Sequence, residues 1–175
     1  MNKSLLLLWG AFLLSVSSVG FAVEREFGDW SWDYADGGTI AMTFSDTGKG
    51  LAQVCNFGDG NCLYKVMFPV TCELGGTYPV LVSTDSAAYS MNMQCLSSDE
   101  EGGIYGITPF DDIDQIIREG NRIGIVMAME HGSFSVVRFS LQGSNAAMDD
   151  MLENFLVARK ARSARERRVS GDQFL

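Results

Sequence analysis

The sequence predicts a mainly-β fold: an antiparallel β-sandwich or barrel-like domain with one short helix and a C-terminal helix. Along several short segments, apolar side chains occur at every second position, as in strands with one buried face and one solvated face. Glycine-rich turn compositions separate these segments at short intervals, which is typical of antiparallel sheets. Two later segments instead carry apolar residues at helical spacing, at 109–119 and from about residue 144.

The predicted strands begin with the clearest alternation of side chains. In the strand at 30–34 aromatic residues alternate with polar ones, and at 40–44 large apolar residues alternate with small ones. We expect the large residues of each strand to face the core. Further strands are predicted at 51–55, 62–68, 79–83 and 89–95. The residues expected to face inward are Trp30, Trp32, Tyr34, Ile40, Met42, Phe44, Tyr89, Met91, Met93 and Cys95.

The segment 109–119 carries the signals of a helix in the expected order. Thr108 is predicted to cap the helix, Pro109 to occupy its first position and Gly120 to end it. A hairpin follows, with strands at 121–129 and 133–141 around a turn at 130–132. The apolar face of the helix is formed by Ile113, Ile116 and Ile117, and that of the second hairpin strand by Val137, Phe139 and Leu141.

A longer helix is predicted from about Ser144, and its charges match the helix dipole. Asp149 and Asp150 lie near its start and basic residues near its end. Residues 158–175 hold six basic and two acidic residues, a net charge of +4, whereas residues 23–157 carry −14. We therefore divide the chain into a β-rich domain at 23–157, which includes the start of this helix, and a basic tail at 158–175. The apolar face of the helix is formed by Met148, Met151, Leu152, Phe155 and Leu156.

The basic tail has two interpretations. One is a solvated helix end that frays into a disordered tail. The other is an electrostatic arm that docks on an acidic neighbour or on an anionic lipid surface.

Residues 1–22 have the order of a secretory signal peptide. One lysine, Lys3, precedes an apolar stretch from Leu5 to about Val16, and small residues lead to Ala22. The apolar stretch is shorter than the roughly 20 residues that span a bilayer, so a membrane anchor is the weaker interpretation. No transmembrane segment is expected in the mature chain. We therefore expect cleavage near Ala22 and a periplasmic or secreted protein.

The four cysteines fit this location, because an even number in an oxidising compartment indicates disulfides. Cys55 and Cys62 flank a run of glycine, asparagine and aspartate that suits a reversing turn, so they can face each other across a hairpin. We therefore favour the pairs Cys55–Cys62 and Cys72–Cys95. A four-cysteine metal site is the alternative, but the CxxC knuckles that such sites use are missing.

Composition and motifs exclude several classes of function. The net charge of −9 argues against binding to nucleic acid, because phosphate contacts need lysine and arginine. His131 is the one histidine, and its place in a predicted turn indicates a surface residue rather than a catalytic base. No nucleotide-binding glycine loop is present. No cofactor is expected.

Two acidic clusters, at 99–101 and 111–114, are candidates for catalytic carboxylates or calcium ligands. The first has the composition of an exposed loop, and the second that of the polar face of a helix start. A glycosidase instead needs two carboxylates across a cleft, one of them in an apolar setting. The ligand spacing of an EF-hand is also missing. Solvated acidic surface is therefore the favoured interpretation of both clusters.

Two parts of the mature chain carry a family resemblance: residues 27–30 (Phe-Gly-Asp-Trp) at its start, and the helix at 113–120, the hairpin and the segment 139–148 towards its end. These resemble the entry strand and the closing elements of the invasion-associated locus B proteins, a family of small exported bacterial β-proteins. The middle of the chain with its cysteines departs from the pattern of that family. The resemblance implies an exported, non-enzymatic β-sandwich linked to host or envelope interaction. It supplies no catalytic residue.

Together these observations predict an exported, non-enzymatic binding protein that contacts a protein or an envelope component. The oligomeric state is left open. One alternative is a disulfide-stapled inhibitor of a hydrolase such as a lysozyme or a protease, and another is a hydrolase with two acids facing each other in a pocket. The candidate contact residues are Asp99, Glu100 and Glu101 in the acidic loop at 98–103, and Arg159, Lys160, Arg162 and Arg165 in the basic tail.

Overall fold

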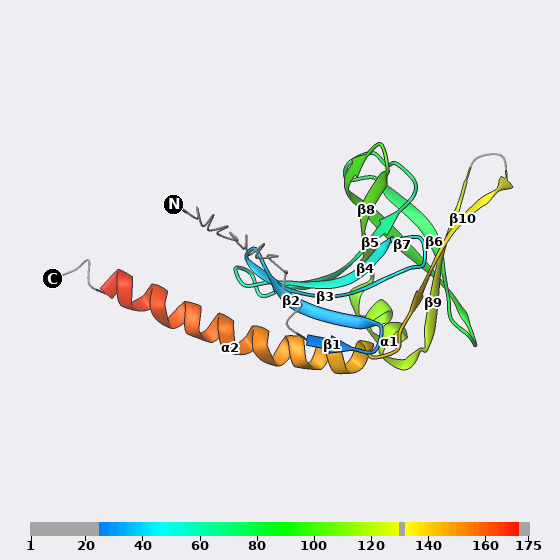
Figure 1. Cartoon of the computed structure of the whole chain (residues 1–175). Helices are drawn as coiled ribbons and strands as arrows, with labels where there is room; N and C mark the ends of the chain where they lie inside the picture. The colour runs from blue at the N-terminus through cyan, green and yellow to red at the C-terminus, as the bar shows by residue number, and fades with distance from the viewer. Residues whose placement is uncertain (1–24, 130–131, 172–175) are drawn as a thin grey trace, which may run out of the picture.

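The computed structural model describes residues 25–129 and 132–171, which form a ten-stranded antiparallel sheet and two helices (Figure 1). This confirms the predicted mainly-β fold class. The order of strands across the sheet is β1-β2-β3-β4-β5-β8-β7-β6-β9-β10, and the sheet is not closed. The elements are β1 (Arg25–Phe27), β2 (Trp30–Ala35), β3 (Gly38–Phe44), β4 (Gly50–Asn56), β5 (Cys62–Phe68), β6 (Thr77–Ser83), β7 (Ala88–Asp99), β8 (Gly102–Thr108), α1 (Phe110–Glu119), β9 (Arg122–Ala128), β10 (Phe134–Ser140) and α2 (Ser144–Gly171). The predicted leader at 1–22 lies outside the described residues.

The sheet curls around the core so that its first strands approach the end of its last strand. The backbone N–H of Asp29 donates to the carbonyl of Gln142 at 3.0 Å. The indole Nε1 of Trp30 donates to the carbonyl of Ser140, also at 3.0 Å. The curled sheet therefore encloses one core, whose largest fully buried side chains include Trp30, Trp32, Tyr64, Tyr105 and Phe68.

Strand β8 has no counterpart in the sequence analysis, although it pairs with both β5 and β7 near the middle of the sheet. The sequence pattern does not reveal this strand, because it is rich in glycine and glycine is unfavourable in strands. Gly103 is nevertheless required here, since a Cβ at this position would lie 2.9 Å from the Sγ of Cys72 and 2.7 Å from the ring of Tyr105. Because Gly103 has no side chain, the strand can pack closely against the loop that carries Cys72.

Helix α1 buries the three isoleucines that the sequence predicts, Ile113, Ile116 and Ile117. Gly120 ends it as expected and donates its N–H to the carbonyl of Ile116 at 3.0 Å. The predicted cap is wrong: Thr108 is the last residue of β8, and Pro109 occupies the N-cap position without a side-chain hydrogen bond. The strand runs into the helix directly, so Thr108 remains in the sheet and pairs with Asn92.

The two disulfides have the pairing favoured from the sequence. Cys55 and Cys62 are direct partners across the β4–β5 hairpin, with their Cα atoms 4.0 Å apart. Cys72 joins the segment after β5 to Cys95 in β7, with a Cα–Cα distance of 6.0 Å. The second bond therefore fastens a long connection to the sheet.

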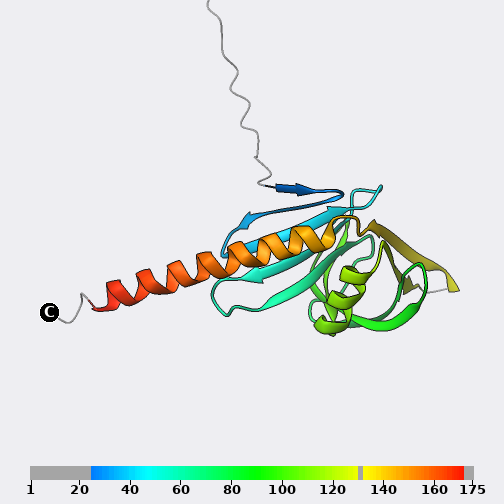
Figure 2. The same cartoon turned by 90° about the horizontal axis from the view of Figure 1, so that it is seen from below.

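Helix α2 lies along β1, β2 and β3 (Figure 2). The carboxylate of Asp150 holds it there, because it accepts from the indole of Trp32 at 2.7 Å and from Arg25 at 2.7 Å. Asp149 and Asp150 therefore bind other elements instead of lying in the first turn of the helix, where the structure places no acidic residue. Neither described helix has a stretch both long and apolar enough to cross a membrane.

Helix α2 also continues to Gly171, beyond the boundary at residue 158 where the sequence suggested fraying. Its inner face is buried as far as Phe155, which stacks on Phe57 with ring centroids 5.3 Å apart. The sequence predicts that Leu156 also belongs to this face, but its side chain is 62% exposed.

Candidate functional site

Strand β3 faces the opposite way from the sequence prediction. Thr39, Ala41 and Thr43 point into the core and are at most 1% exposed. Ile40, Met42 and Phe44, which were predicted to be buried, therefore point away from the core, and Phe44 is 59% exposed. The cause is α2, which packs on the inner side of β2 and β3 and needs small side chains beneath it. Alternation indicates that the two faces differ, and packing partners decide which face is buried.

The outward residues of β3 continue into an apolar surface on the neighbouring strands. Ile40 pairs with Val54, which pairs with Leu63. At the other end of the strands, Phe44 is opposite Gly50, and Met67 is opposite Ile104. We call this surface the outer apolar face; it consists of Ile40, Met42, Phe44, Ala52, Val54, Leu63, Met67, Leu96 and Ile104.

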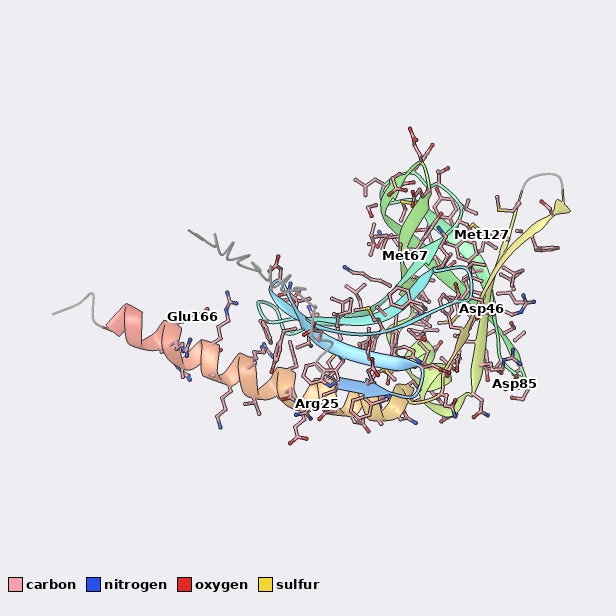
Figure 3. The ribbon with its side chains drawn as sticks, in the orientation of Figure 1. Arg25, Asp46, Met67, Asp85, Met127 and Glu166 are labelled. Atoms are coloured by element: carbon pink, nitrogen blue, oxygen red, sulfur yellow. A yellow bond between two sulfur atoms is a disulfide. The ribbon has the colours of Figure 1, made fainter. Side chains whose placement is uncertain are left out.

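The outer apolar face contains two glycines, and the larger apolar side chains beside each glycine cover its position. The face is therefore continuous. A Cβ at Gly50 would lie 3.4 Å from the Sδ of Met67 and 3.5 Å from the ring of Phe44. A Cβ at Gly106 would lie 3.5 Å from Leu96 and 3.8 Å from Leu63. Met67 is 42% exposed and is labelled on the upper strands in Figure 3. An exposed patch of this kind is typical of a surface that another molecule covers.

Charged groups lie within and beside this face. Lys65 pairs with Ala52 on one side and with Gly106 on the other, so it lies among the apolar residues and is half-buried. At one edge, Lys49 donates from Nζ to the carbonyl of Glu101 at 3.3 Å. The face therefore combines an apolar surface with a central cation.

The candidate contact residues Asp99, Glu100 and Glu101 lie at the tip of the β7–β8 hairpin. The predicted loop at 98–103 is mostly strand, so that Glu100 and Glu101 alone lie between the two strands. The turn is braced, because Asp99 accepts from the N–H of Glu101 at 2.9 Å and Ser98 accepts from the N–H of Cys72 at 3.0 Å. We call residues 99–101 the acidic hairpin turn.

The candidate contact residues Arg159, Lys160, Arg162 and Arg165 all lie on α2 beyond Phe155. We call residues 156–171 the basic extension. Arg159 still touches the body, donating to the carbonyl of Asp59 at 3.5 Å. Figures 1 and 2 show the basic extension and the β7–β8 hairpin on opposite sides of the molecule. The structure therefore does not bring the two predicted contact groups together.

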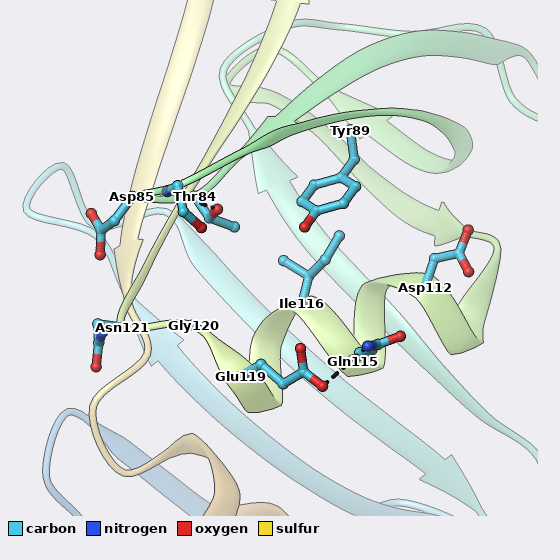
Figure 4. Close-up of a pocket in the computed structure, with 10 residues that line it drawn as sticks. Thr84, Asp85, Tyr89, Asp112, Gln115, Ile116, Glu119, Gly120 and Asn121 are labelled. Atoms are coloured by element: carbon cyan, nitrogen blue, oxygen red, sulfur yellow. Dashed lines mark hydrogen bonds between the residues drawn. The ribbon is translucent and has the colours of Figure 1, made fainter.

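A cleft that the sequence analysis missed lies between α1 and the turn that joins β6 to β7 (Figure 4). Its volume is about 440 Å³. Tyr89 and Ile116 face each other within it, and three exposed carboxylates line it: Asp85, Asp112 and Glu119. Asp112 and Glu119 both lie on α1, whereas Asp85 comes from the turn between β6 and β7, so the three acids meet only because the helix packs beside that turn. The sequence shows Asp112 within the cluster at 111–114 but gives no local sign that Asp85 joins it. We call this the acid-lined cleft.

Asp114 does not belong to the solvated acidic cluster that the sequence predicts. It is half-buried and accepts hydrogen bonds from the hydroxyl of Tyr64 at 2.7 Å and from Gln53 at 3.2 Å. Arg118 donates to it at 2.9 Å and also to Asp149 of α2 at 2.8 Å. This network therefore joins the sheet to both helices.

The network has consequences for protonation. Burial, and then the hydrogen bond to Asp114, raise the pKa of Tyr64 far above its ordinary value of 10.0. Burial lowers the pKa of Arg118, but the hydrogen bond to Asp149 and the charge of Asp114 outweigh it and the pKa is raised. Tyr64 therefore stays neutral and Arg118 stays charged.

We expect the replacement Tyr64→Phe to change how stability depends on pH. At neutral pH the variant should be less stable by about 1 kcal/mol, because a buried hydrogen bond is lost. Above pH 10.0 the unfolded wild-type chain releases the proton of Tyr64 and the folded chain keeps it, so wild-type stability falls as pH rises. Urea unfolding between neutral pH and a pH above 10.0 should thus show the two proteins converging. A constant difference would contradict the burial of this proton.

The described residues contain no group of three or more histidine, cysteine, aspartate or glutamate side chains able to hold a metal ion. His131, which the sequence places in a turn, lies outside the described residues. The acids of the two predicted clusters are separated: those at 99–101 lie on the hairpin, Asp112 lines the cleft and Asp114 is bound in the network.

Comparison with known proteins shows similarity at the level of the fold. No protein-family model and no curated protein sequence matches the chain. The fold is similar to the crystal structure of invasion associated protein b from Bartonella henselae, with a TM-score of 0.57 and 16% sequence identity. The similarity covers 74% of this chain and 95% of that one. The resemblance to the invasion-associated locus B proteins is thereby confirmed as a relationship of fold.

Proposed function

We propose that this chain is an exported protein that acts by binding a protein partner at the cell envelope through its outer apolar face, and that it is not an enzyme. The observation that carries the proposal is the apolar surface over β3, β4, β5 and β8, which lies outside the core. A protein partner suits it better than lipid, because the half-buried Lys65 at its centre can form one specific contact with an acidic side chain of a partner. Two disulfides and the predicted leader support export. The structural similarity to an invasion-associated protein agrees with a role at a surface.

The carboxylates support binding rather than catalysis. A catalytic acid needs an apolar environment that keeps it protonated. In the acid-lined cleft, Asp85, Asp112 and Glu119 are all exposed and solvated. Asp114, which is better buried, is neutralised by Arg118. The chain therefore offers no carboxylate pair suited to hydrolysis among the described residues.

We expect the double replacement Phe44→Lys/Met67→Lys to reduce capture of the partner from the native envelope fraction by at least about tenfold, because two charges would be placed inside an apolar contact. The measurement is a quantitative pull-down in which the captured protein is identified and its binding to the purified chain is then titrated. Both replaced side chains are already exposed, so the fold should persist, and urea unfolding checks this.

Leu74→Lys is the matched control, because Leu74 is 79% exposed but lies outside the outer apolar face. It should leave capture unchanged. If the face variant and the control retain the same protein equally well, the proposed binding surface is wrong.

One observation favours a second candidate function, inhibition of a hydrolase. The acidic hairpin turn is braced by the bonds at Asp99 and Ser98 and by the disulfide of Cys95, and a rigid projecting turn can enter an enzyme cleft. Lysozyme and protease assays with the purified chain test this directly. Inhibition that disappears in Glu100→Lys/Glu101→Lys would favour the inhibitor, and the lack of any inhibition would exclude it for the enzymes assayed.

A further inference from the structure

The basic extension is a helix with a high positive charge, which favours binding to an anionic partner. Beyond Phe155, the side chains of residues 160–167 are all exposed, and Figure 1 shows this part of α2 running past the strands. Arg159, Arg162 and Arg165 follow one another at three-residue spacing, so that like charges are neighbours on the helix surface. Glu166 is the one acidic residue between positions 156 and 171, and its bond to Arg162 is 3.3 Å long between two exposed side chains. An opposite charge docked here would stabilise the helix.

The composition of the extension favours a protein surface over a membrane. Helices that lie in a membrane interface bury a continuous apolar face. From residue 158 to residue 167, where the side chains are described, the apolar residues of the extension are alanines interspersed among basic residues, and these form no large apolar face. Its recognition is therefore electrostatic, through the arginine and lysine head groups.

The acid-lined cleft provides the complementary surface. Its described lining residues include Asp85, Asp112 and Glu119 and no lysine or arginine. Tyr89 and Ile116 add an apolar wall on which the aliphatic stem of an arginine can pack. A volume of about 440 Å³ accommodates such side chains.

A molecule cannot place its basic extension in its own cleft, because the two lie at opposite ends. Helix α2 begins beside α1, where Ser144 donates to the carbonyl of Ile117 at 3.1 Å and Asn145 to that of Arg118 at 2.7 Å. From there the helix runs straight, and Lys160 lies about 24 Å further along its axis. Figure 3 shows Glu166 of the extension and Asp85 of the cleft at opposite ends of the molecule. Contact between these surfaces must therefore be intermolecular.

We propose that the basic extension of one molecule docks in the acid-lined cleft of a second copy of this chain. The contact joins two different surfaces, so it is head-to-tail and generates a ring or an open chain of subunits. It rests on charge complementarity between the +4 tail at 158–175 and a domain that carries −14 at 23–157. It does not involve the outer apolar face, which stays available for another partner.

Sedimentation velocity of the full chain across a range of protein concentrations tests the proposal. We expect association at about 0.01 M salt and monomers at about 1 M salt, because the Debye length falls from about 30 Å to about 3 Å. The tail variant Lys160→Glu/Arg165→Glu and the cleft variant Asp85→Lys/Glu119→Lys should each weaken association by at least about tenfold. An equimolar mixture of the two variants should associate again, because the unaltered basic extension of the cleft variant can then dock in the unaltered cleft of the tail variant.

The control variant Glu100→Lys/Glu101→Lys changes the net charge as much as the cleft variant but lies on the acidic hairpin turn. It should associate like the wild type. The proposal is overturned if the wild type is monomeric at low salt at every concentration, or if the hairpin control and the cleft variant behave alike. It is equally overturned if the chain stays monomeric and instead sediments with phosphatidylglycerol vesicles, since that result would assign the extension to a lipid surface. Circular dichroism confirms that the variants keep their helix.

Discussion

Replacement of Gly143 by alanine should lower the free energy of unfolding by about 4 kcal/mol. Gly143 immediately precedes α2 and has a φ of +91°, a conformation that residues with a Cβ rarely adopt. Its Cβ would collide with the carbonyl oxygen of Phe27 and lie 3.2 Å from the backbone nitrogen of Gly28. These atoms are backbone of the β1–β2 turn, which Asp29 fastens to Gln142, so they cannot move aside cheaply. The variant should therefore separate the two ends of the curled sheet.

Gly48→Ala is the matched control for this prediction. Gly48 has a φ of +74°, but no atom lies within 4 Å of the position of its Cβ. It should therefore cost about 1 kcal/mol, from the backbone conformation alone. Urea unfolding of both variants gives the comparison. Equal losses of stability would mean that the contact between the first turn and the last strand does not hold the sheet together.

Replacement of Asp114 by alanine should lower the free energy of unfolding by about 3 kcal/mol. The carboxylate accepts from Tyr64, Gln53 and Arg118, and the variant would leave these donors without their shared acceptor. The network joins the sheet to α1 and α2. We therefore also expect that the variant, compared with the wild type, shows a larger increase in the rate of amide hydrogen exchange in both helices than in β4.

Asp111→Ala provides the control on the same helix. Asp111 is exposed and lies in the first turn of α1, where it interacts with the helix dipole. Its loss should cost less than about 1 kcal/mol. If both variants were destabilised equally, Asp114 would be a surface acid as the sequence indicated, and the network would have no special role.

Local patterns in the sequence predict the elements that depend on local chemistry. The isoleucines of α1, the stop at Gly120 and the facing cysteines of the β4–β5 hairpin are all found where the sequence places them. Each depends on residues close together in the chain, so spacing alone carries the information. Strand β8 is missed because its glycines serve contacts with distant residues, among them Cys72.

The candidate surfaces are less visible in the sequence for the same reason. The outer apolar face arises because α2, about a hundred residues further along the chain, selects the small side chains of β3 for the core. The acid-lined cleft gathers Asp85 and Glu119 only after β6, β7 and α1 have packed. The basic extension could be recognised from composition, since its residues are contiguous, but its continuation as a helix to Gly171 could not.

The most direct test of binding through the outer apolar face is site-specific photo-crosslinking in the native envelope. A photoreactive amino acid placed at Met67 would lie inside the face, and one placed at Leu74 would lie on exposed surface outside it. We predict one defined protein adduct from position 67 and none from position 74. Adducts of the same protein from both positions, or no adduct from position 67 while the chain is retained in that fraction, would contradict the assignment of this face as the binding surface.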